Sequence, residues 1–224
     1  MQKLLGGIHS FQSSYFQANR ELFEHLSSKG QRPDVLFFTC ADSRVVPDLI
    51  TNASPGELFT VRNAGNIIPP YDPHNVSGEA ASAEYAVEVL GVKDIIVCGH
   101  TQCGAMHAIL HPEEATTLEF VLEWVKHGAR TRAIIQEAYP HLRGNDLVTA
   151  AVEENVLVQL EHLRTHPAVA TRLARGDLGL HGWVYKIATG EVYAYESSNA
   201  QFQPVVEASP SIERQSVAPA IRAI

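Results

Sequence analysis

Two short segments of the chain carry the side chains best suited to metal chemistry. Cys40 opens the segment Cys-Ala-Asp-Ser-Arg, and His100 and Cys103 stand at the ends of His-Thr-Gln-Cys. Two thiols and one imidazole are a ligand set that suits zinc, and three protein ligands are the number found in open catalytic zinc sites. Neither segment is specific alone, because a single cysteine is usually a small buried hydrophobic residue. Together they predict a zinc site if the fold brings them into contact.

Asp42 and Arg44 follow Cys40 closely and supply a charged pair beside it. An arginine can hold a carboxylate through two parallel hydrogen bonds, which orient the carboxylate and keep it ionised. An aspartate held in this way either ligates the metal or accepts a hydrogen bond from a water molecule on it. The residues alone leave both roles open.

The third thiol, Cys98, permits a different interpretation. It lies inside an apolar run and is most simply a core residue, but it would close a structural four-ligand zinc site if it faced the others. A Cys40–His100 nucleophile pair is a second alternative, and it leaves Cys103 and the Asp–Arg pair without a role. The Cys40–Arg44 spacing is too short for a phosphatase loop, and no dinucleotide, P-loop or nucleophile-elbow motif follows a predicted strand.

Two histidine pairs are spaced four residues apart on expected helices, His107 with His111 and His162 with His166. This spacing places two imidazoles on one helical face, where they could share a metal ion. Exposed histidines at this spacing are common without a metal, and we interpret both pairs as surface residues.

Three apolar runs predict the strands that must position the ligands. Residues 34–39, 58–61 and 94–98 have the pattern of strands buried on both faces. A helix over 80–90 separates the second run from the third, and this order implies parallel pairing with crossover helices. Ligand sites in parallel sheets form at the carboxyl ends of strands, so Cys40 and His100 should meet at one edge.

The remaining segments complete an α/β fold with a central, mostly parallel sheet flanked by helices. Apolar residues over 8–26 predict an amphipathic helix that ends at Gly30, and further helices are expected over 118–126, 130–139 and 147–163. Residues 180–187 and 192–195 flank Thr189-Gly190 and predict either a hairpin-like pair or an added edge of the sheet. We expect one domain over 1–203 and a loose C-terminal tail, rich in Ala, Ser and Pro, over 204–224.

Charge and composition limit the kinds of molecule that the protein is expected to bind. The 224 residues include 17 Lys and Arg against 25 Asp and Glu, a net charge of −8 that argues against nucleic acids and anionic membranes. A helix needs about 18 consecutive apolar residues to span a bilayer, and no apolar run in the sequence is nearly that long. The N-terminus shows no secretory signal. Three cysteines do not form a disulfide framework. We therefore expect a cytoplasmic protein with neither nucleic-acid nor membrane partners.

With these residues assembled, the chain resembles the β-class carbonic anhydrases, in particular the subgroup shared by plants and many bacteria. The resemblance extends from about residue 4 to about residue 202. It rests on the motifs at 40–44, 62–66 (Arg-Asn-Ala-Gly-Asn) and 98–104, with later landmarks at 154–156 and 180–185. It implies a zinc lyase that hydrates carbon dioxide reversibly to bicarbonate and a proton, by attack of zinc-bound hydroxide.

The resemblance also implies a role for each site residue. Cys40, His100 and Cys103 would hold one Zn²⁺ per subunit. Asp42 and Arg44 would form the catalytic dyad, with Asp42 a metal ligand only in a closed state known from some relatives. The substrate pocket carries over to five positions, Gln31, Phe59, Ala64, Tyr85 and Gly104.

Proteins of this kind are dimers that assemble into larger, even-numbered homo-oligomers, and positions such as Gln31 and Tyr85 are contributed across the dimer interface. The first helix would pack as an arm on the partner subunit. A carboxysome or similar compartment is compatible with the same motifs. Three rival functions remain: hydrolysis of carbonyl sulfide or carbon disulfide, a closed zinc site that serves assembly or sensing, and a metal-independent thiol hydrolase.

Overall fold

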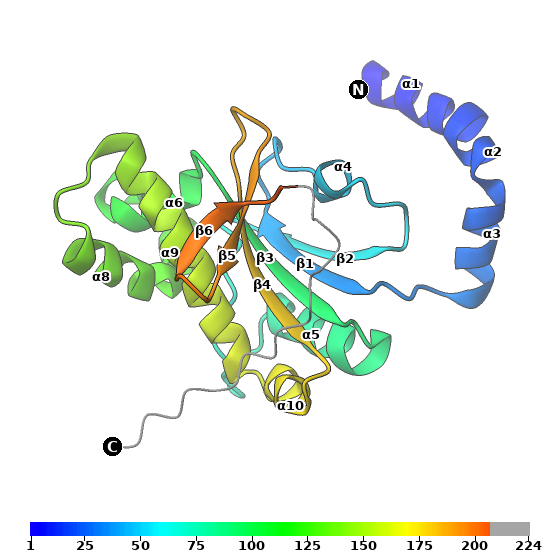
Figure 1. Ribbon diagram of the computed structural model, residues 1–224. Helices are drawn as coiled ribbons and strands as arrows, with labels where there is room; N and C mark the ends of the chain where they lie inside the picture. Colours follow the sequence, from blue (N-terminus) through cyan, green and yellow to red (C-terminus); the bar gives the residue numbers. More distant parts are fainter. Residues whose placement is uncertain (207–224) are drawn as a thin grey trace.

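A six-stranded sheet lies at the centre of the protein, whose computed structural model describes residues 1–206. The strand order is β2-β1-β3-β4-β5-β6, with β1 to β4 parallel and β5 and β6 antiparallel (Figure 1). The strands are β1 (Val35–Cys40), β2 (Leu58–Asn63), β3 (Asp94–His100), β4 (Gly179–Tyr185), β5 (Val192–Glu196) and β6 (Gln201–Pro204). The predicted α/β fold with a mostly parallel sheet is confirmed.

Three helices precede β1, and helices fill the connections between the consecutive strands from β1 to β4, as parallel pairing requires. They are α1 (Gln2–Ser10), α2 (Phe16–Ala18), α3 (Arg20–Lys29), α4 (Pro47–Thr51), α5 (Gly78–Glu84), α6 (Gly104–Leu110), α7 (Glu119–Val125), α8 (Ala129–Ala138), α9 (Gly144–Thr165) and α10 (Pro167–Arg175). Wider π-helical turns continue the chain over Phe11–Tyr15 and Tyr85–Leu90, and short 3₁₀ turns cover Pro112–Ala115 and Lys126–Gly128. The helices expected over 80–90, 118–126, 130–139 and 147–163 are present.

The N-terminal helices form an arm that projects away from the sheet (Figure 1). The arm is not one continuous helix, because the backbone leaves helical geometry at Asn19, with φ −115° and ψ 22°. It ends at Gly30, whose φ of 77° lies in the region that favours glycine. None of the residues in α1, α2 or α3 is buried within the chain.

Strand β1 is buried on both faces, which explains its unbroken apolar sequence. Leu36 and Phe38 belong to the larger hydrophobic cluster, whereas Phe37 packs in a second cluster with Ile96 and Cys98. The alternation follows from the period of two along a strand, which sends neighbouring side chains to opposite faces of the sheet.

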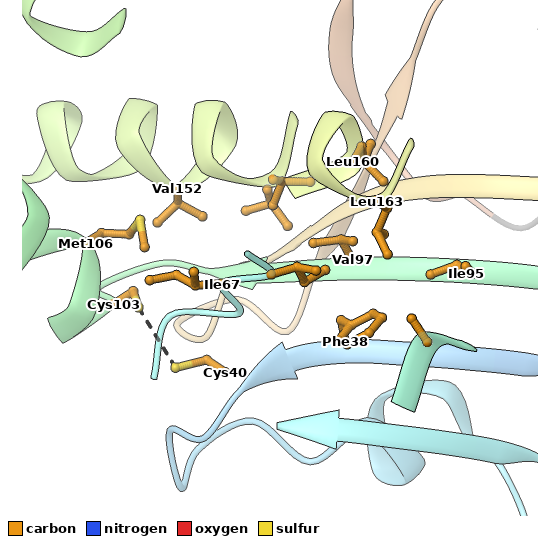
Figure 2. Close-up of a cluster of buried hydrophobic side chains, with 14 of the residues drawn as sticks. Phe38, Cys40, Ile67, Ile95, Val97, Cys103, Met106, Val152, Leu160 and Leu163 are labelled. Carbon is orange, nitrogen blue, oxygen red and sulfur yellow. Dashed lines mark hydrogen bonds between the residues drawn. The ribbon is translucent and has the colours of Figure 1, made fainter. Parts of the chain in front are cut away.

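Helix α9 covers the face of the sheet that carries the larger cluster (Figure 2). It approaches β3 closely at Gly99, where a Cβ atom would lie 2.8 Å from Cγ1 of Val152 and 3.0 Å from Cγ2 of Val156. A glycine is therefore required at this position for helix and strand to pack at this distance.

The end of the described chain differs from the sequence prediction. Residue 204 closes a sixth strand, whereas a tail was expected from there onward; the backbone of Val205 still donates a hydrogen bond to the Val192 carbonyl. The remainder of that expected tail, 207–224, lies outside the described residues. Among the helices within residues 1–206, none combines the length and the hydropathy needed to cross a bilayer.

Candidate metal centre

The structure brings Cys40, His100 and Cys103 together at the carboxyl edge of the sheet. Cys40 is the last residue of β1, His100 the last of β3, and Cys103 directly precedes α6. Their ligand atoms all lie within 4.8 Å of one another, and the Cys40 and Cys103 sulfurs are 3.9 Å apart (Figure 2). Since parallel strands end at a common edge, two loops far apart in the chain deliver one constellation.

The spacing of the two sulfurs and the state of His100 both fit a zinc ion. Two sulfurs at tetrahedral corners, each about 2.3 Å from zinc, lie about 3.8 Å apart. The imidazole of His100 is completely buried, and its Nδ1 hydrogen-bonds to the Thr101 carbonyl at 2.9 Å. Among the described residues Nε2 has no hydrogen-bond partner. A buried polar atom without a partner is costly, and a metal bond from Nε2 would remove that cost.

The pKa values of the two thiols are shifted in opposite directions. The hydrogen bond from Cys103, assisted by His100 and the Gly65 amide, lowers the pKa of Cys40 to about 4 despite burial. The same bond, together with burial, raises the pKa of Cys103. The first-turn amides of α6 do lower the pKa of Cys103, as a helix N-terminus should.

Cys98 does not join the metal ligands. It lies in the second hydrophobic cluster, with Phe37 and Ile96, and has no place in the group that Cys40, His100 and Cys103 form. Complete burial raises the pKa of its thiol to about 12, so the thiol stays protonated. This arrangement contradicts a four-ligand site closed by Cys98.

Arg44 holds Asp42 through three hydrogen bonds. Nε of Arg44 donates to Oδ1 at 2.9 Å, Nη2 donates to Oδ2 at 2.8 Å, and the Arg44 backbone N–H donates to Oδ1 at 3.0 Å. These bonds hold the pKa of Asp42 well below its usual range. Oδ2 also lies 3.8 Å from Nε2 of His100, so the ionised carboxylate stands beside the three candidate ligands.

Two further residues, whose roles the sequence does not predict, support this loop. Arg62 donates from Nε to the Cys40 carbonyl at 3.1 Å and from Nη2 to the Asp42 carbonyl at 2.8 Å. Gln102, with φ 59°, accepts from Arg44 through its backbone and its side-chain oxygen at 3.3 and 3.4 Å. Arg62 belongs to the 62–66 motif, but its partners are backbone carbonyls, which the sequence cannot identify.

The five expected pocket residues fall into two groups. Ala64 directly follows β2 and Gly104 opens α6, so both lie at the edge of the sheet that carries the candidate ligands. Phe59 lies near the start of β2, and its ring centroid is 6.0 Å from that of Tyr85. Gln31 precedes β1, whose length from Val35 to Cys40 is about 16 Å. The second group is thus displaced along the strands from the candidate ligands of its own chain.

The histidine pairs differ from each other. His107 and His111 are partly exposed and approach Glu114 and Glu113, in agreement with the surface interpretation. For His162 and His166 that interpretation is wrong, because both are buried. His162 hydrogen-bonds through Nδ1 to the Ile68 carbonyl at 2.8 Å, and His166 through Nε2 to the Pro69 carbonyl at 3.0 Å. Both imidazoles thus provide hydrogen-bond partners for backbone carbonyls of a buried loop.

Comparison with known proteins identifies similar sequences and structures. A family model described as "Carbonic anhydrase" matches residues 35–192. A carbonic anhydrase of Synechocystis sp. is 51% identical over 197 residues, which cover 88% of this chain and 71% of that protein. The solved β-carbonic anhydrase CcaA superposes with a TM-score of 0.88 at 49% identity, covering 91% of this chain and 98% of that one.

More distant structures have the same fold. Crystal structures of two tetrameric β-carbonic anhydrases from Sordaria macrospora include a match with a TM-score of 0.74 at 25% identity. It covers 86% of this chain and 95% of that one.

Proposed function

The chain belongs to the β-class carbonic anhydrase family, and on that premise we propose that it hydrates carbon dioxide reversibly at a zinc ion held by Cys40, His100 and Cys103. The observation that carries the proposal is the convergence of three buried ligand atoms within 4.8 Å, beside an aspartate clamped by an arginine. When bound, zinc lowers the pKa of a coordinated water so that hydroxide is available near neutral pH.

The three ligand residues are prepared for this task to different degrees. Both sulfurs must be thiolates to bind the metal; the hydrogen bond between them lowers the pKa of Cys40 and favours its thiolate, whereas it raises the pKa of Cys103. Nδ1 of His100 is occupied by the Thr101 carbonyl, which fixes the ring and leaves Nε2 as the ligand atom.

Asp42 is placed to accept a hydrogen bond from the attacking water. An ionised carboxylate offers about two lone pairs on each oxygen. Arg44 donates two hydrogen bonds to Oδ1 but one to Oδ2, so the spare acceptor is on Oδ2, the oxygen nearer to His100. Asp42 therefore accepts that hydrogen bond and orients the oxygen lone pair toward the carbon of carbon dioxide, and Arg44 holds the carboxylate in this position.

The pocket is proposed to be completed by a second copy of the chain. Ala64 and Gly104 lie at the ligand edge, but Gln31, Phe59 and Tyr85 lie toward the other end of the strands. In a symmetric dimer these three would reach the partner's site, where the aromatic rings line an apolar pocket for carbon dioxide and Gln31 donates to developing negative charge. The tetrameric relatives of known structure support an even-numbered assembly.

Replacing Asp42 with asparagine tests the proposed mechanism. An amide offers fewer acceptor positions than a carboxylate and cannot form the same charged pair with Arg44, so Asp42→Asn should keep its zinc while kcat/KM for hydration falls about 100-fold or more. Zinc content and stopped-flow hydration of carbon dioxide measure the two effects. Asp48→Asn, an exposed change on α4, is the matched control and should leave both unchanged. A wild-type rate in Asp42→Asn would assign the residue to a structural role.

A further inference from the structure

One peptide group, between Ala64 and Gly65, is held at both ends beside the Cys40 sulfur. Its N–H, from Gly65, donates to Sγ of Cys40 at 3.4 Å, and its carbonyl, from Ala64, accepts from Nε1 of Trp124 at 2.8 Å. The N–H and C=O of a planar trans peptide point in opposite directions. The two hydrogen bonds therefore set the orientation of the whole group, with the sulfur on one side and the indole on the other.

The backbone at Gly65 has little freedom to move away from this position. Its φ is 85°, and a Cβ atom would lie 2.7 Å from Cβ of Ala105 and 3.1 Å from Cε of Met106. The loop thus passes directly against the first turn of α6, the helix that Cys103 precedes. This close approach brings the peptide N–H within reach of the sulfur.

The following peptide is fixed by helix α9. The Gly65 carbonyl accepts from Nδ2 of Asn155 at 3.1 Å, and Asn155 is completely buried. Oδ1 of Asn155 accepts from Thr131 and Gln159 at 3.2 and 2.9 Å, which determines the orientation of the amide. With its far side fixed by α9, the loop depends on Trp124 for the orientation of the peptide that faces the sulfur.

We infer that Trp124 is a positioning residue of the metal centre, which acts through the Ala64 carbonyl to hold the Gly65 N–H on the sulfur of Cys40. An N–H directed at a thiolate stabilises its charge and orients its lone pairs, and such support of a ligand affects metal affinity. A donor on the carbonyl of the same peptide also polarises the group and strengthens the N–H as a donor. The inference rests on the proposed function, because it takes Cys40 as a metal ligand.

The indole N–H, rather than the ring, is the part of Trp124 that this role requires. The ring also packs edge-on against His127, with centroids 5.4 Å apart, so removing the whole side chain would disturb α7 as well. A role in packing alone predicts that an isostere without the N–H behaves like tryptophan. A positioning role predicts that it does not.

The decisive experiment replaces Trp124 with benzothienylalanine, which keeps the bicyclic ring but lacks the N–H. The replacement is made in the background variant Trp183→Phe, because Trp183 is the only other tryptophan and the analogue then enters at position 124 alone. Trp183 packs against Phe37 in the second cluster. Zinc affinity is measured by competition with a chelator, and the near-ultraviolet thiolate-to-metal band is recorded after loading with Co²⁺. We expect the isostere to weaken zinc binding about tenfold and to shift that band, with the midpoint of thermal unfolding of the metal-free protein unchanged.

The controls separate failure of the inference from failure of the proposed function. Trp183→Phe itself should match the wild-type protein in affinity and in spectrum. If the isostere also matches that background in both, Trp124 does not position the metal centre and the inference is overturned. If the wild-type protein shows no thiolate-to-cobalt band at all, the proposed metal ligands are wrong, and the inference falls with them. The simpler variant Trp124→Phe should repeat the isostere's spectral shift.

Discussion

In the proposed mechanism Asp42 and Arg44 divide one catalytic task between them. Arg44 orients the carboxylate, and Asp42 retains one free acceptor position on Oδ2 beside His100. The planar guanidinium is essential to this arrangement, because its Nε and Nη2 contact both carboxylate oxygens at once.

Arg44→Ala and Arg44→Lys should both lower kcat/KM for hydration, by about 10- to 100-fold. Arg44 depresses the pKa of Asp42, so its removal lets that pKa rise toward about 3.9, which is still far below neutral pH. The carboxylate therefore stays charged, and only its orientation is lost. The defect should be a constant factor between about pH 7 and about pH 9, since no ionisation of Asp42 falls in that range.

Rates of both variants and of the control Arg175→Ala, an exposed change on α10, across this pH range provide the check. Recovery of activity at high pH would mean that Arg44 acts through the protonation of Asp42 instead.

Individual residues could be predicted from the sequence where one motif carried the information. Cys40, Asp42 and Arg44 are close in sequence, and the ends of two apolar runs indicated where His100 would join them. The side of the sheet that Cys98 occupies was not predictable, because its strand is apolar on both faces. Trp124 gave no signal at all, since its partner is a backbone carbonyl 60 residues away.

Among the elements, helix α9 does more than cover the sheet. Its polar side chains bind successive groups of the loop that follows β2: Asn155 holds the Gly65 carbonyl, Oε1 of Gln159 accepts from the Ile68 N–H at 2.8 Å, and His162 holds the Ile68 carbonyl. These groups are buried, so each pair is needed to avoid an unsatisfied donor or acceptor. These hydrogen bonds hold the loop that reaches the Cys40 sulfur against α9.

Gln159→Leu should destabilise the protein by about 1–3 kcal/mol, because it leaves the Ile68 N–H without an acceptor and removes a donor from Asn155. Urea unfolding of the metal-free protein measures the free energy of unfolding. Gln136→Leu makes the same change at an exposed position on α8, and its effect should stay within about 0.5 kcal/mol. Equal effects of the two substitutions would show that the α9 contacts contribute nothing specific.

The type and order of the elements followed from apolar periodicity, but their polar contacts did not. His162 and His166 stand on a helix that the sequence predicted correctly, yet they were interpreted as exposed because polar residues on helices usually face water. Their true partners lie 94 and 97 residues earlier, in a loop without a recognisable pattern. Local patterns predict elements, whereas such long-range pairing is decided by the packed fold.

At the scale of the whole molecule, the N-terminal arm and the divided pocket point to the same assembly. Large apolar side chains on the arm are exposed, among them Leu4, Leu5, Ile8, Phe11 and Tyr15. A patch of this kind is typical of a surface that binds a partner. The pocket residues near the start of the strands also need a second chain if they are to serve the site.

Mixed oligomers test directly whether each chain contributes Gln31 to the site of its partner. Chains carrying Asp42→Asn and chains carrying Gln31→Ala should each be nearly inactive alone. In a mixed dimer one site carries both changes and the other carries neither, so co-expression at equal levels should restore about a quarter of the wild-type activity. Mixing the two chains after purification, without subunit exchange, is the control and should restore nothing. Absence of recovery in verified mixed dimers would place Gln31 in the site of its own chain, or outside the site.

The most direct measurement of the central claim is the zinc-edge X-ray absorption spectrum of active, zinc-loaded protein. We predict one zinc ion per chain with two sulfur neighbours at about 2.3 Å, one imidazole nitrogen at about 2.0 Å and one exchangeable oxygen. Three sulfurs would bring Cys98 into the site, and full hydration activity without zinc would remove the metal from the mechanism. Either result would contradict the account given above.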